Sequence, residues 1–388
     1  MTAAPKILYL AHDLTDAAVH RRVMMLKDGG ADVTVAGFTR SDNGDQPVAG
    51  IAPVSMGRTY NGCFAQRIAA VLRAVLQPPK NLNGLAPDII IARNLEMLAV
   101  GVRLRAMSEP APALVYESLD IHRLLLGKGI AARILRRLEG WLSRRAGLLV
   151  TSSPSFVSEY FNPVSDVRLP VALVENKIYD AQGTLSAAPT QRPAGLPWRI
   201  GWFGVIRCRK SLAILAGLVR DSEGAVEVVI RGRPALDQIP DFHQIVDTTP
   251  GMSFGGPYQY PADLAEMYGS VHFTWAIDMY EEGLNSSWLL PNRLYEGGMF
   301  DAVPIARADV ATGAYLRSLG VGVMLPASIM PVLTEFFETL TAERYQALGQ
   351  AARNVPRRQW RHTREDCRQL VAQLHALNQN DKEHRRYA

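Results

Sequence analysis

The segment WLLPNRLYEGGMFDAVPIARAD, residues 288–309, sets the interpretation of the whole chain. Pro291 suits the first turn of a helix, because the N–H group that proline lacks would have no partner there. The apolar run at 303–306 has the length and composition of a short buried strand, with a proline near its start. The segment therefore predicts a helix that begins near residue 292 and leads into a strand of a buried sheet.

Polar residues occupy the start of this predicted helix. The first backbone N–H groups of a helix have no partner within it and attract anions, and the fork of donors on Arg293 matches phosphate geometry. We expect Asn292 beside them, and Glu296 to accept hydrogen bonds from ribose hydroxyls. Gly297 and Gly298 are expected to let a flat ligand approach the backbone. These features predict a nucleotide-sugar site, and the alternative is a helix start whose Arg and Glu face solvent.

Composition and length indicate an ordinary globular chain with more than one core. The sequence has 388 residues, of which 48% are apolar, and this length favours two domains. Its three cysteines, Cys63, Cys208 and Cys367, lack metal-site spacing, and an odd count fits the reduced thiols of a cytoplasm. No run resembles a signal peptide or approaches the ~18 apolar residues of a membrane span. We therefore expect a cytoplasmic protein that does not cross a bilayer.

Strand-like apolar runs alternate with helix-like stretches along both halves of the chain. In the first half these runs are 6–11, 32–38, 88–92, 113–118, 147–153 and 171–176. In the second half they are 198–204, 226–232, 252–256, 271–278, 303–306 and 321–325. Nearly continuous apolar strands between helices are typical of a parallel sheet that is covered on both faces.

This alternation predicts an α/β protein with two Rossmann-like, doubly wound parallel-sheet domains facing a cleft. The first domain is expected at 1–180 and the second at 198–355. Between them, residues 181–197 are rich in Ala, Pro, Thr and Gln and are expected to form a linker. The tail at 356–388 is expected to be a helix that packs back on the first domain.

Charge is distributed unevenly, although the net charge is only +5. Between residues 123 and 145 the basic residues face a single acid, Glu139, while Ile134, Leu138 and Trp141 recur at helical spacing. A second basic amphipathic stretch occupies 66–80. Two interpretations remain open: helices docked on a sheet with solvated arginines, or a peripheral contact with an anionic membrane surface. Because no aromatic residues are interleaved with the charges, no nucleic-acid partner is expected.

Motifs of several common enzyme classes are missing from the sequence. The first strand of each half is followed by AHDLTDAAV and GVIRCRKS, neither of which contains Gly-x-Gly-x-x-Gly. The phosphate-binding Gly-x-x-x-x-Gly-Lys-Ser/Thr motif and zinc-type Cys/His clusters are absent as well. The sequence therefore disfavours dinucleotide, P-loop and zinc enzymes, and we expect no metal and no cofactor.

Three stretches of the second half resemble the donor domain of GT-B glycosyltransferases, specifically bacterial exopolysaccharide transferases of the succinoglycan type. They are WFGVIRCRKSL at 202–212, FGGPYQYPADLAEMYGSVHFTWAID at 254–278 and NSSWLLPNRLYEGG at 285–298. The resemblance implies a metal-independent transfer from a nucleotide sugar, with a UDP-linked donor expected.

The resemblance also implies roles for individual residues of the donor domain. Arg207, Arg209 and Lys210 match the basic residues that neutralise the diphosphate of the leaving group, which needs cations as the glycosidic bond breaks. Asp278 ends a predicted strand and is expected to accept a hydrogen bond from a sugar hydroxyl. The alternatives are a solvated Arg209 and an Asp278 that caps the loop after it.

The stereochemical course of the reaction remains open in the sequence. Many retaining GT-B enzymes carry two glutamates separated by seven residues, and the second of these matches Glu296. The position eight residues earlier is Trp288 in this chain. The sequence therefore leaves both inversion and retention open.

The stretch LVYESLDIHR, residues 114–123, places acid and base groups at the end of a predicted strand. It is similar to a Leu-Val-Tyr-x-x-x-Asp stretch of inverting xanthan-type glucuronosyltransferases, whose Asp is the proposed base. An inverting transfer needs one group to accept the proton of the acceptor hydroxyl. The resemblance therefore implies that Asp120 is the catalytic base, with His122 as the second candidate beside Glu117.

His12 and Asp13 follow the first strand, where many GT-B enzymes carry a Gly-Gly loop. We expect these two residues to contact the acceptor or the donor sugar, while Asp13 as the N-cap of the next helix is the alternative. On that helix, Arg21 and Arg22 are expected to face solvent.

Together these observations predict a glycosyltransferase of exopolysaccharide biosynthesis. It is expected to move a sugar from a UDP-linked donor to a polyprenyl-diphosphate-linked saccharide, as a peripheral protein on the inner face of the plasma membrane. A sugar-nucleotide epimerase of the GT-B fold and a non-catalytic scaffold of a polysaccharide assembly complex are the alternatives.

Overall fold

The computed structural model describes residues 3–40, 46–60, 64–82, 84–185 and 193–387. The chain divides into two compact units, which are described separately below. Unit 1 comprises Met1–Glu175 with His362–Ala388, and unit 2 comprises Asn176–Arg361. The stretch 181–197, expected as a linker, belongs to unit 2, and 186–192 within it lie outside the described residues.

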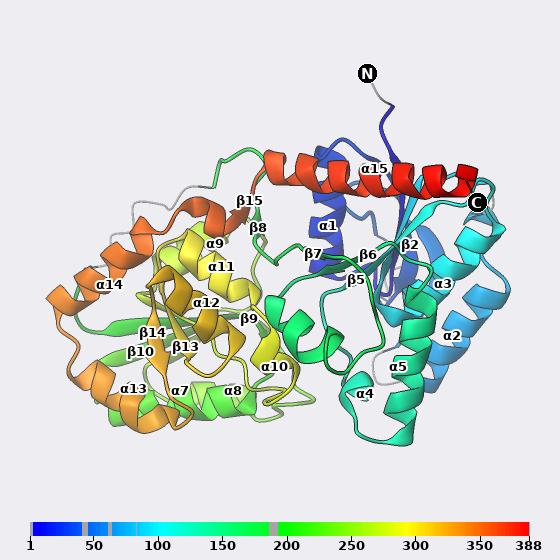
Figure 1. Cartoon of the computed structure of the whole chain (residues 1–388). Helices are drawn as coiled ribbons and strands as arrows, with labels where there is room; N and C mark the ends of the chain where they lie inside the picture. The colour runs from blue at the N-terminus through cyan, green and yellow to red at the C-terminus, as the bar shows by residue number, and fades with distance from the viewer. Residues whose placement is uncertain (1–2, 41–45, 61–63, 83, 186–192, 388) are drawn as a thin grey trace. The chain divides into compact units, whose positions relative to one another are not determined.

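Unit 1 is built on a seven-stranded parallel sheet with the order β3-β2-β1-β4-β5-β6-β7 (Figure 1). The strands are β1 (Lys6–Ala11), β2 (Asp32–Thr39), β3 (Val54–Arg58), β4 (Ile89–Arg93), β5 (Ala113–Ser118), β6 (Leu148–Thr151) and β7 (Val171–Leu173). The predicted parallel sheet is confirmed. The sequence did not predict β3, because this edge strand is partly exposed and lacks an apolar run.

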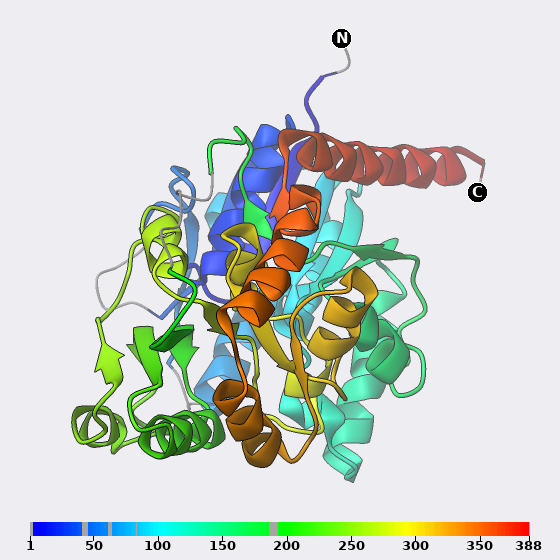
Figure 2. The same ribbon diagram turned by 90° about the vertical axis from the view of Figure 1, so that its left-hand side faces the viewer.

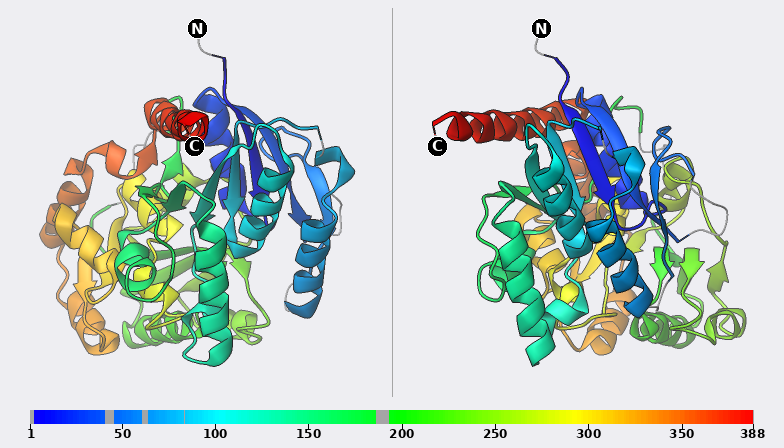
Figure 3. Two further views of the ribbon diagram at one scale, coloured as in Figure 1. Left: turned by 45° about the vertical axis from the view of Figure 1, so that its right-hand side comes forward. Right: turned by 90° about the vertical axis from the view of Figure 1, so that its right-hand side faces the viewer.

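Helices cover both faces of this sheet, as right-handed crossovers in both directions from β1 require. On one face α1 (Ala17–Asp28) packs against α15 (Arg364–Tyr387), which returns from the end of the chain and contacts β4 and β5 (Figures 1 and 3). The other face carries α2 (Phe64–Leu76), α3 (Asn94–Met107) and α5 (Ile130–Ser143). The short elements are η1 (Lys80–Leu82), α4 (Arg123–Leu126), α6 (Pro154–Phe156) and the π-helix η2 (Val157–Phe161).

Unit 2 contains a second parallel sheet, with six strands in the order β11-β10-β9-β12-β13-β14. The strands are β9 (Trp198–Ile206), β10 (Val226–Pro234), β11 (Met252–Phe254), β12 (Phe273–Trp275), β13 (Val303–Arg307) and β14 (Val323–Leu325). Two shorter strands, β8 (Ile178–Tyr179) and β15 (Arg361–His362), pair with each other. Both halves of the chain are therefore built on parallel sheets, as predicted.

The helices of unit 2 alternate with these strands, and α13 and α14 contact β14 and β13 (Figure 2). They are α7 (Arg209–Asp221), α8 (Phe242–Asp247), α9 (Leu264–Gly269), α10 (Asn285–Trp288), α11 (Asn292–Met299), α12 (Ala311–Leu319), α13 (Ile329–Glu338), α14 (Ala342–Asn354) and η3 (Arg357–Gln359). Alternate residues of β9 enter separate cores, with Trp202 in one and Phe203 in the other. This alternation buries both faces of the sheet.

Two glycines let α11 pack closely against its neighbours. A Cβ atom on Gly297 would lie 2.3 Å from Cγ2 of Thr274 on β12, and one on Gly298 would lie 2.5 Å from the Trp360 ring. The expectation that these glycines admit a flat ligand to the backbone is wrong, since protein atoms fill the space beside them. They instead seat the helix that carries Arg293 and Glu296 directly on the sheet.

We predict that Gly297→Ala lowers the free energy of unfolding by about 1–3 kcal/mol, because the added methyl overlaps Cγ2 of Thr274. Urea titration followed by circular dichroism measures the change. Adding Thr274→Ser removes the overlapping methyl and should restore part of the loss. Gly195→Ala is the matched control, because no atom lies within 4 Å of its added Cβ. Equal effects at positions 297 and 195 would contradict the packing role.

Candidate functional site

Three of the expected donor residues meet at the carboxyl edge of the unit 2 sheet. Arg293, in the first turn of α11, is buried, and its Nη2 donates a hydrogen bond to the carbonyl oxygen of Ile277 at 2.8 Å. The same nitrogen lies 3.8 Å from Oδ2 of Asp278. Nη2 of Arg207 lies 3.7 Å from that oxygen, and its guanidinium stacks over the Tyr280 ring at 4.7 Å. The arrangement places two guanidinium groups around one carboxylate.

Asp278 also holds the loop that follows β12. Its Oδ1 accepts hydrogen bonds from the backbone N–H of Tyr280 and from Oγ of Ser286, both at 2.9 Å. Burial alone would raise the pKa of Asp278, but the charges of Arg293 and Arg207 outweigh it and lower that pKa. The side chain is therefore ionised at neutral pH, and it forms the loop cap that the sequence offered as an alternative.

The other two basic residues of the β9–α7 region each pair with a carboxylate. Arg209 forms a bidentate salt bridge with Asp241, with N···O distances of 2.6 and 2.7 Å. Lys210 pairs with Glu282, which also binds Arg307 at the end of β13. Sequence reasoning missed Arg307 and Glu282. Arg307 could have been predicted, because it directly follows the apolar run at 303–306. Parallel strands place their carboxyl ends at one edge of the sheet, so Arg307 had to lie at the same edge as Asp278.

Glu296 is buried and engages a tyrosine. Its Oε2 accepts a hydrogen bond from the hydroxyl of Tyr268 at 2.8 Å. Burial and the negative charge of Glu296 both raise the pKa of Tyr268, so its phenol keeps the proton that it donates. The alternative of a helix start whose Arg293 and Glu296 face solvent is wrong, since both side chains are buried. Asn292, at the first position of α11, is exposed.

Arg293 and Arg231 of unit 2 each keep a buried Nε donor unused. Nε of Arg293 and Nε of Arg231 have no hydrogen-bond partner among the described residues. Arg231, on β10, donates from Nη2 to the carbonyl oxygen of Pro257 at 2.9 Å and lies 3.5 Å from Asp263. A buried donor without a partner costs free energy, which an anionic or carbonyl-bearing ligand would recover. Arg231 was not predicted, because its strand VEVVIRG reads as core.

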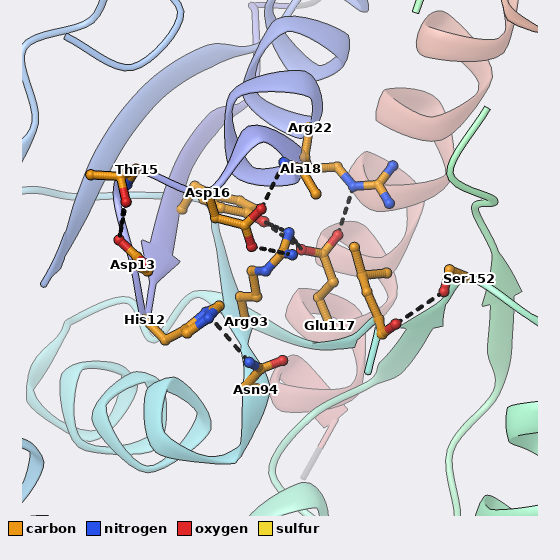
Figure 4. A network of polar contacts seen from close by, with 12 residues as sticks. His12, Asp13, Thr15, Asp16, Ala18, Arg22, Arg93, Asn94, Glu117 and Ser152 are labelled. Atoms are coloured by element: carbon orange, nitrogen blue, oxygen red, sulfur yellow. Dashed lines mark hydrogen bonds and ion pairs between the residues drawn. The ribbon is translucent and has the colours of Figure 1, made fainter. Parts of the chain in front are cut away.

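A buried charged network lies at the corresponding edge of the unit 1 sheet (Figure 4). Glu117, at the end of β5, binds Nε of Arg22 at 2.6 Å, lies 3.7 Å from Nη1 of Arg93, and accepts a hydrogen bond from the Tyr9 hydroxyl. Nη2 of Arg93, at the end of β4, binds Asp16 at 2.8 Å. The network joins α1 to β1, β4 and β5. The expectation that Arg21 and Arg22 face solvent is wrong, since both side chains are buried.

Asp13 and Asp16 hold the loop between β1 and α1. Oδ1 of Asp13 accepts hydrogen bonds from the backbone N–H and the hydroxyl of Thr15, at 3.0 and 2.7 Å, and Oδ2 lies 3.4 Å from Nε of Arg40. The N-cap of α1 is Asp16, which accepts from the N–H of Ala18 at 2.8 Å. The alternative that Asp13 caps this helix is therefore wrong.

His12 lies beside this network and contacts Asn94. Its Nδ1 is 3.4 Å from the Asn94 amide nitrogen, and Asn94 adopts the left-handed conformation with φ of 67°. Burial, assisted by the positive charge of Arg93, lowers the pKa of His12 to about 4. The imidazole is therefore neutral at pH 7 and available for hydrogen bonds to uncharged hydroxyls.

Asp120 and His122 both lie exposed in the loop after β5. The backbone oxygen of Asp120 is 3.4 Å from the hydroxyl of Ser118, and Nδ1 of His122 accepts from the N–H of Leu124 at 3.3 Å as the N-cap of α4. Glu117, three positions before Asp120, is 1% exposed within the charged network. Of these two acids, Glu117 is therefore part of the buried network, whereas Asp120 is exposed to solvent.

Other features bear on metal and membrane binding. Within the described part of the chain, no three His, Cys, Asp or Glu side chains gather as metal ligands would. None of the described helices combines the length and the hydropathy needed to span a bilayer. Cys208 and Cys367 are buried, and Cys63 lies outside the described residues.

The sequence is 47% identical over 377 residues to the succinoglycan biosynthesis protein ExoL of Rhizobium meliloti (strain 1021), covering 96% of this chain and 94% of that protein. The chain belongs to the ExoL family. Scanning against models of protein families gave no match.

Solved structures of low sequence identity share the fold of this chain. Anabaena HepE in complex with UDP has a TM-score of 0.67 at 15% identity, covering 99% of this chain and 100% of that one. Sucrose-phosphate synthase from Thermosynechococcus elongatus has a TM-score of 0.66 at 13% identity, covering 99% and 98%. The fold is therefore the GT-B fold, as the sequence predicted.

We predict that NMR titration of His12 gives a midpoint near pH 4. An unfolded histidine titrates near 6.5, so between these values the unfolded chain binds a proton that the folded chain does not. The contribution of His12 to stability is therefore full above pH 6.5 and decreases as the pH falls toward 4. Urea unfolding at several pH values should show a shallower dependence in His12→Gln than in wild type.

His243→Gln provides the control for this experiment, because His243 is exposed on α8 of unit 2. An ordinary midpoint for His12, or an unchanged pH dependence in His12→Gln, would refute the burial of a neutral imidazole.

Proposed function

We propose that the protein transfers a sugar from a UDP-linked donor to a polyprenyl-diphosphate-linked saccharide during assembly of an exopolysaccharide such as succinoglycan. The main supporting observation is the cluster of Arg207, Asp278 and Arg293 beside Glu296 at the carboxyl edge of the unit 2 sheet. Ligands of open α/β sheets bind at this edge. The complex of HepE with UDP and glucose supports the choice of nucleotide.

In the proposed donor complex, Glu296 accepts hydrogen bonds from the ribose hydroxyls. Arg293 and Arg207 lie next to the diphosphate, and Lys210 and Arg209 exchange their carboxylate partners for phosphate oxygens. Cations placed around the diphosphate stabilise the charge that develops as the glycosidic bond breaks. Asp278 then serves two purposes, since it orients both arginines and offers an oxygen to a sugar hydroxyl.

In the proposed reaction, Asp120 acts as the general base and the configuration inverts. Its carboxylate takes the proton of the acceptor hydroxyl while that oxygen attacks the anomeric carbon, and UDP leaves with the bonding electron pair. The exposure of Asp120 supports this role, because a base must reach a bound acceptor. His12, Asp13 and His122 are proposed to contact the acceptor saccharide or the donor sugar.

The proposed acceptor also determines where the protein works. A saccharide carried on a polyprenyl diphosphate stays at the membrane, so we place the protein at the cytoplasmic face of the plasma membrane as a peripheral protein. The basic helices of unit 1 are the proposed contact with anionic lipid.

We predict that Asp120→Asn lowers the turnover of sugar transfer by about 10²- to 10⁴-fold, the usual contribution of a general base. UDP affinity and the urea midpoint should stay at wild-type values, because the side chain is exposed and the amide is isosteric. Turnover is measured as the transfer of radiolabelled sugar to the lipid-linked acceptor in a membrane extract. Glu109→Gln, an exposed acid elsewhere on unit 1, is the matched control. Retained turnover in Asp120→Asn would rule out this base.

We predict that Glu296→Gln weakens UDP binding by about tenfold or more, since a hydrogen bond to a charged group contributes about 1.5–3 kcal/mol. Arg293→Lys should also weaken it, because an ammonium lacks the planar fork of donors. Isothermal titration calorimetry measures both affinities. Tyr268→Phe removes the Glu296 partner while keeping its charge, so it should change UDP affinity much less. Unchanged affinity in both site variants would exclude this donor site.

A further inference from the structure

Three helices share one face of unit 1. α3 packs on β4 and β5, and it is flanked by α2 on one side and α5 on the other (Figures 1 and 3). Because α3 lies between them, the outward sides of α2 and α5 bound a single continuous surface. We call this surface the α2–α5 face.

The apolar stripe of α5 lies on the outside of this face. Ile130 is 68% exposed, Ile134 is 60% exposed and Trp141 is 49% exposed, with Leu138 exposed between them. Successive members are three or four residues apart and therefore lie on one side of the helix. The sequence-based alternative that this apolar side docks on the sheet is wrong for these residues.

The side of α5 that faces the protein explains this orientation. Glu139, on the buried side, accepts hydrogen bonds from the hydroxyls of Tyr116, Tyr160 and Ser165 at 2.7–2.9 Å. A carboxylate with three donors around it is held firmly. Since Glu139 is fixed inward, the rotation of α5 is fixed, and Ile134 is directed to solvent.

α2 presents a matching stripe. Ile68, Leu72 and Leu76 recur every four residues, and Leu76 is 73% exposed. Among residues 66–76 of α2, whose side chains the structure describes, the small Ala74 is the buried one. Both helices on this face thus expose several large apolar side chains, although Leu142 of α5 is buried. An arrangement that leaves so much apolar area in water indicates a partner surface.

The charges around these stripes specify the chemistry of the partner. Arg133, Arg137 and Arg144 are exposed along the flank of the α5 stripe, and Arg103 is exposed on α3. The guanidinium of Arg145 stacks over the Trp141 ring at 4.0 Å.

Acids on the same helices are few and already engaged. The sequences of α2, α3 and α5 contain two, the buried Glu139 and Glu96, which is paired with Arg67 at 2.7 Å. Beyond Trp141, a hollow is lined by Arg105, Arg144 and Arg145. The face therefore combines exposed apolar stripes with an excess of positive charge.

We propose that the α2–α5 face binds the surface of an anionic lipid bilayer. The apolar residues of α2 and α5 enter the boundary between headgroups and acyl chains, while the flanking arginines bind lipid phosphates. A second copy of the chain would bring the same positive charges together, and a nucleic acid would leave the apolar stripes in water. The proposal deepens the proposed function and rests on it for its purpose, since a lipid-linked acceptor has to be met at a membrane.

Vesicle sedimentation of the full chain tests this proposal. Wild type should bind vesicles of phosphatidylcholine mixed with phosphatidylglycerol and bind pure phosphatidylcholine at least tenfold more weakly, and salt should reduce the binding. The double variant Ile134→Ser/Leu138→Ser should lose at least tenfold in partition coefficient. Arg133→Glu/Arg137→Glu should lose more than tenfold, since each basic residue contributes about fivefold. These side chains are exposed, so the urea midpoints should stay at wild-type values.

Matched controls come from unit 2. Val332→Ser removes an exposed apolar side chain from α13, and Arg220→Glu reverses an exposed charge at the end of α7, so neither should alter vesicle binding. Wild-type vesicle binding in both α5 variants would overturn the proposal. So would a stable dimer that the α5 substitutions dissolve, since the face would then bind a second copy.

Two further measurements separate this proposal from the proposed function. UDP calorimetry and transfer to a water-soluble, short-chain acceptor should be unchanged in the α5 variants, while transfer to lipid-embedded acceptor falls with vesicle binding. If the wild-type protein transfers sugar but does not bind anionic vesicles, the membrane-binding role of the α2–α5 face alone is refuted. Wild type that binds vesicles through α5 but neither binds UDP nor transfers sugar would refute the proposed function alone.

Discussion

A guanidinium group can be buried only where oxygen atoms surround it, and this constraint organises the carboxyl edge of both sheets. In unit 1, Arg93 and Arg22 share Glu117, so the ends of β4 and β5 and the first helix are tied together. In unit 2, Arg293 reaches the carbonyl oxygen of Ile277 and the carboxylate of Asp278, which ties α11 to the end of β12. Removing one member of such a pair leaves a buried charge without compensation. The loops that carry the candidate catalytic and binding groups are therefore held by buried ion pairs, and in unit 2 the paired groups are also the proposed donor ligands.

The two sheets could be predicted from sequence because buried parallel strands are nearly continuous apolar runs, and such runs are local. β3 could not, since an exposed edge strand lacks that signal. In the candidate site, Arg293 and Glu296 were predicted from the start of a helix, Asp278 from the end of a strand, and Arg207 from the resemblance to GT-B donor domains. The charged network of unit 1 could not be predicted, because Arg22 and Glu117 are 95 positions apart and nothing local in the sequence links them. For the same reason Arg22 was expected in solvent, and the glycines of α11 were assigned to a ligand instead of to Thr274 and Trp360.

The orientation of α5 shows a second limit of pattern reasoning. Helical periodicity shows that a helix has an apolar side and a basic side, but it does not show which side faces the sheet. Both sides can face away from the sheet if another residue fixes the rotation of the helix about its axis. Glu139 does this through hydrogen bonds to Tyr116, Tyr160 and Ser165, a set that only the tertiary fold assembles. A single buried carboxylate thereby determines which surface of unit 1 is apolar.

The return of α15 to unit 1 has a consequence for biosynthesis on the ribosome. Unit 2 is contiguous in sequence, whereas unit 1 lacks the helix that covers α1 until the residues after unit 2 are made. Close packing of Gly29 against the backbone of Cys367 and the side chain of Val371 shows how tightly this late helix fits. A nascent chain can thus complete its second unit while the first still exposes the apolar side of α1. The unit whose translation begins first therefore acquires its last helix only after the other unit has been made.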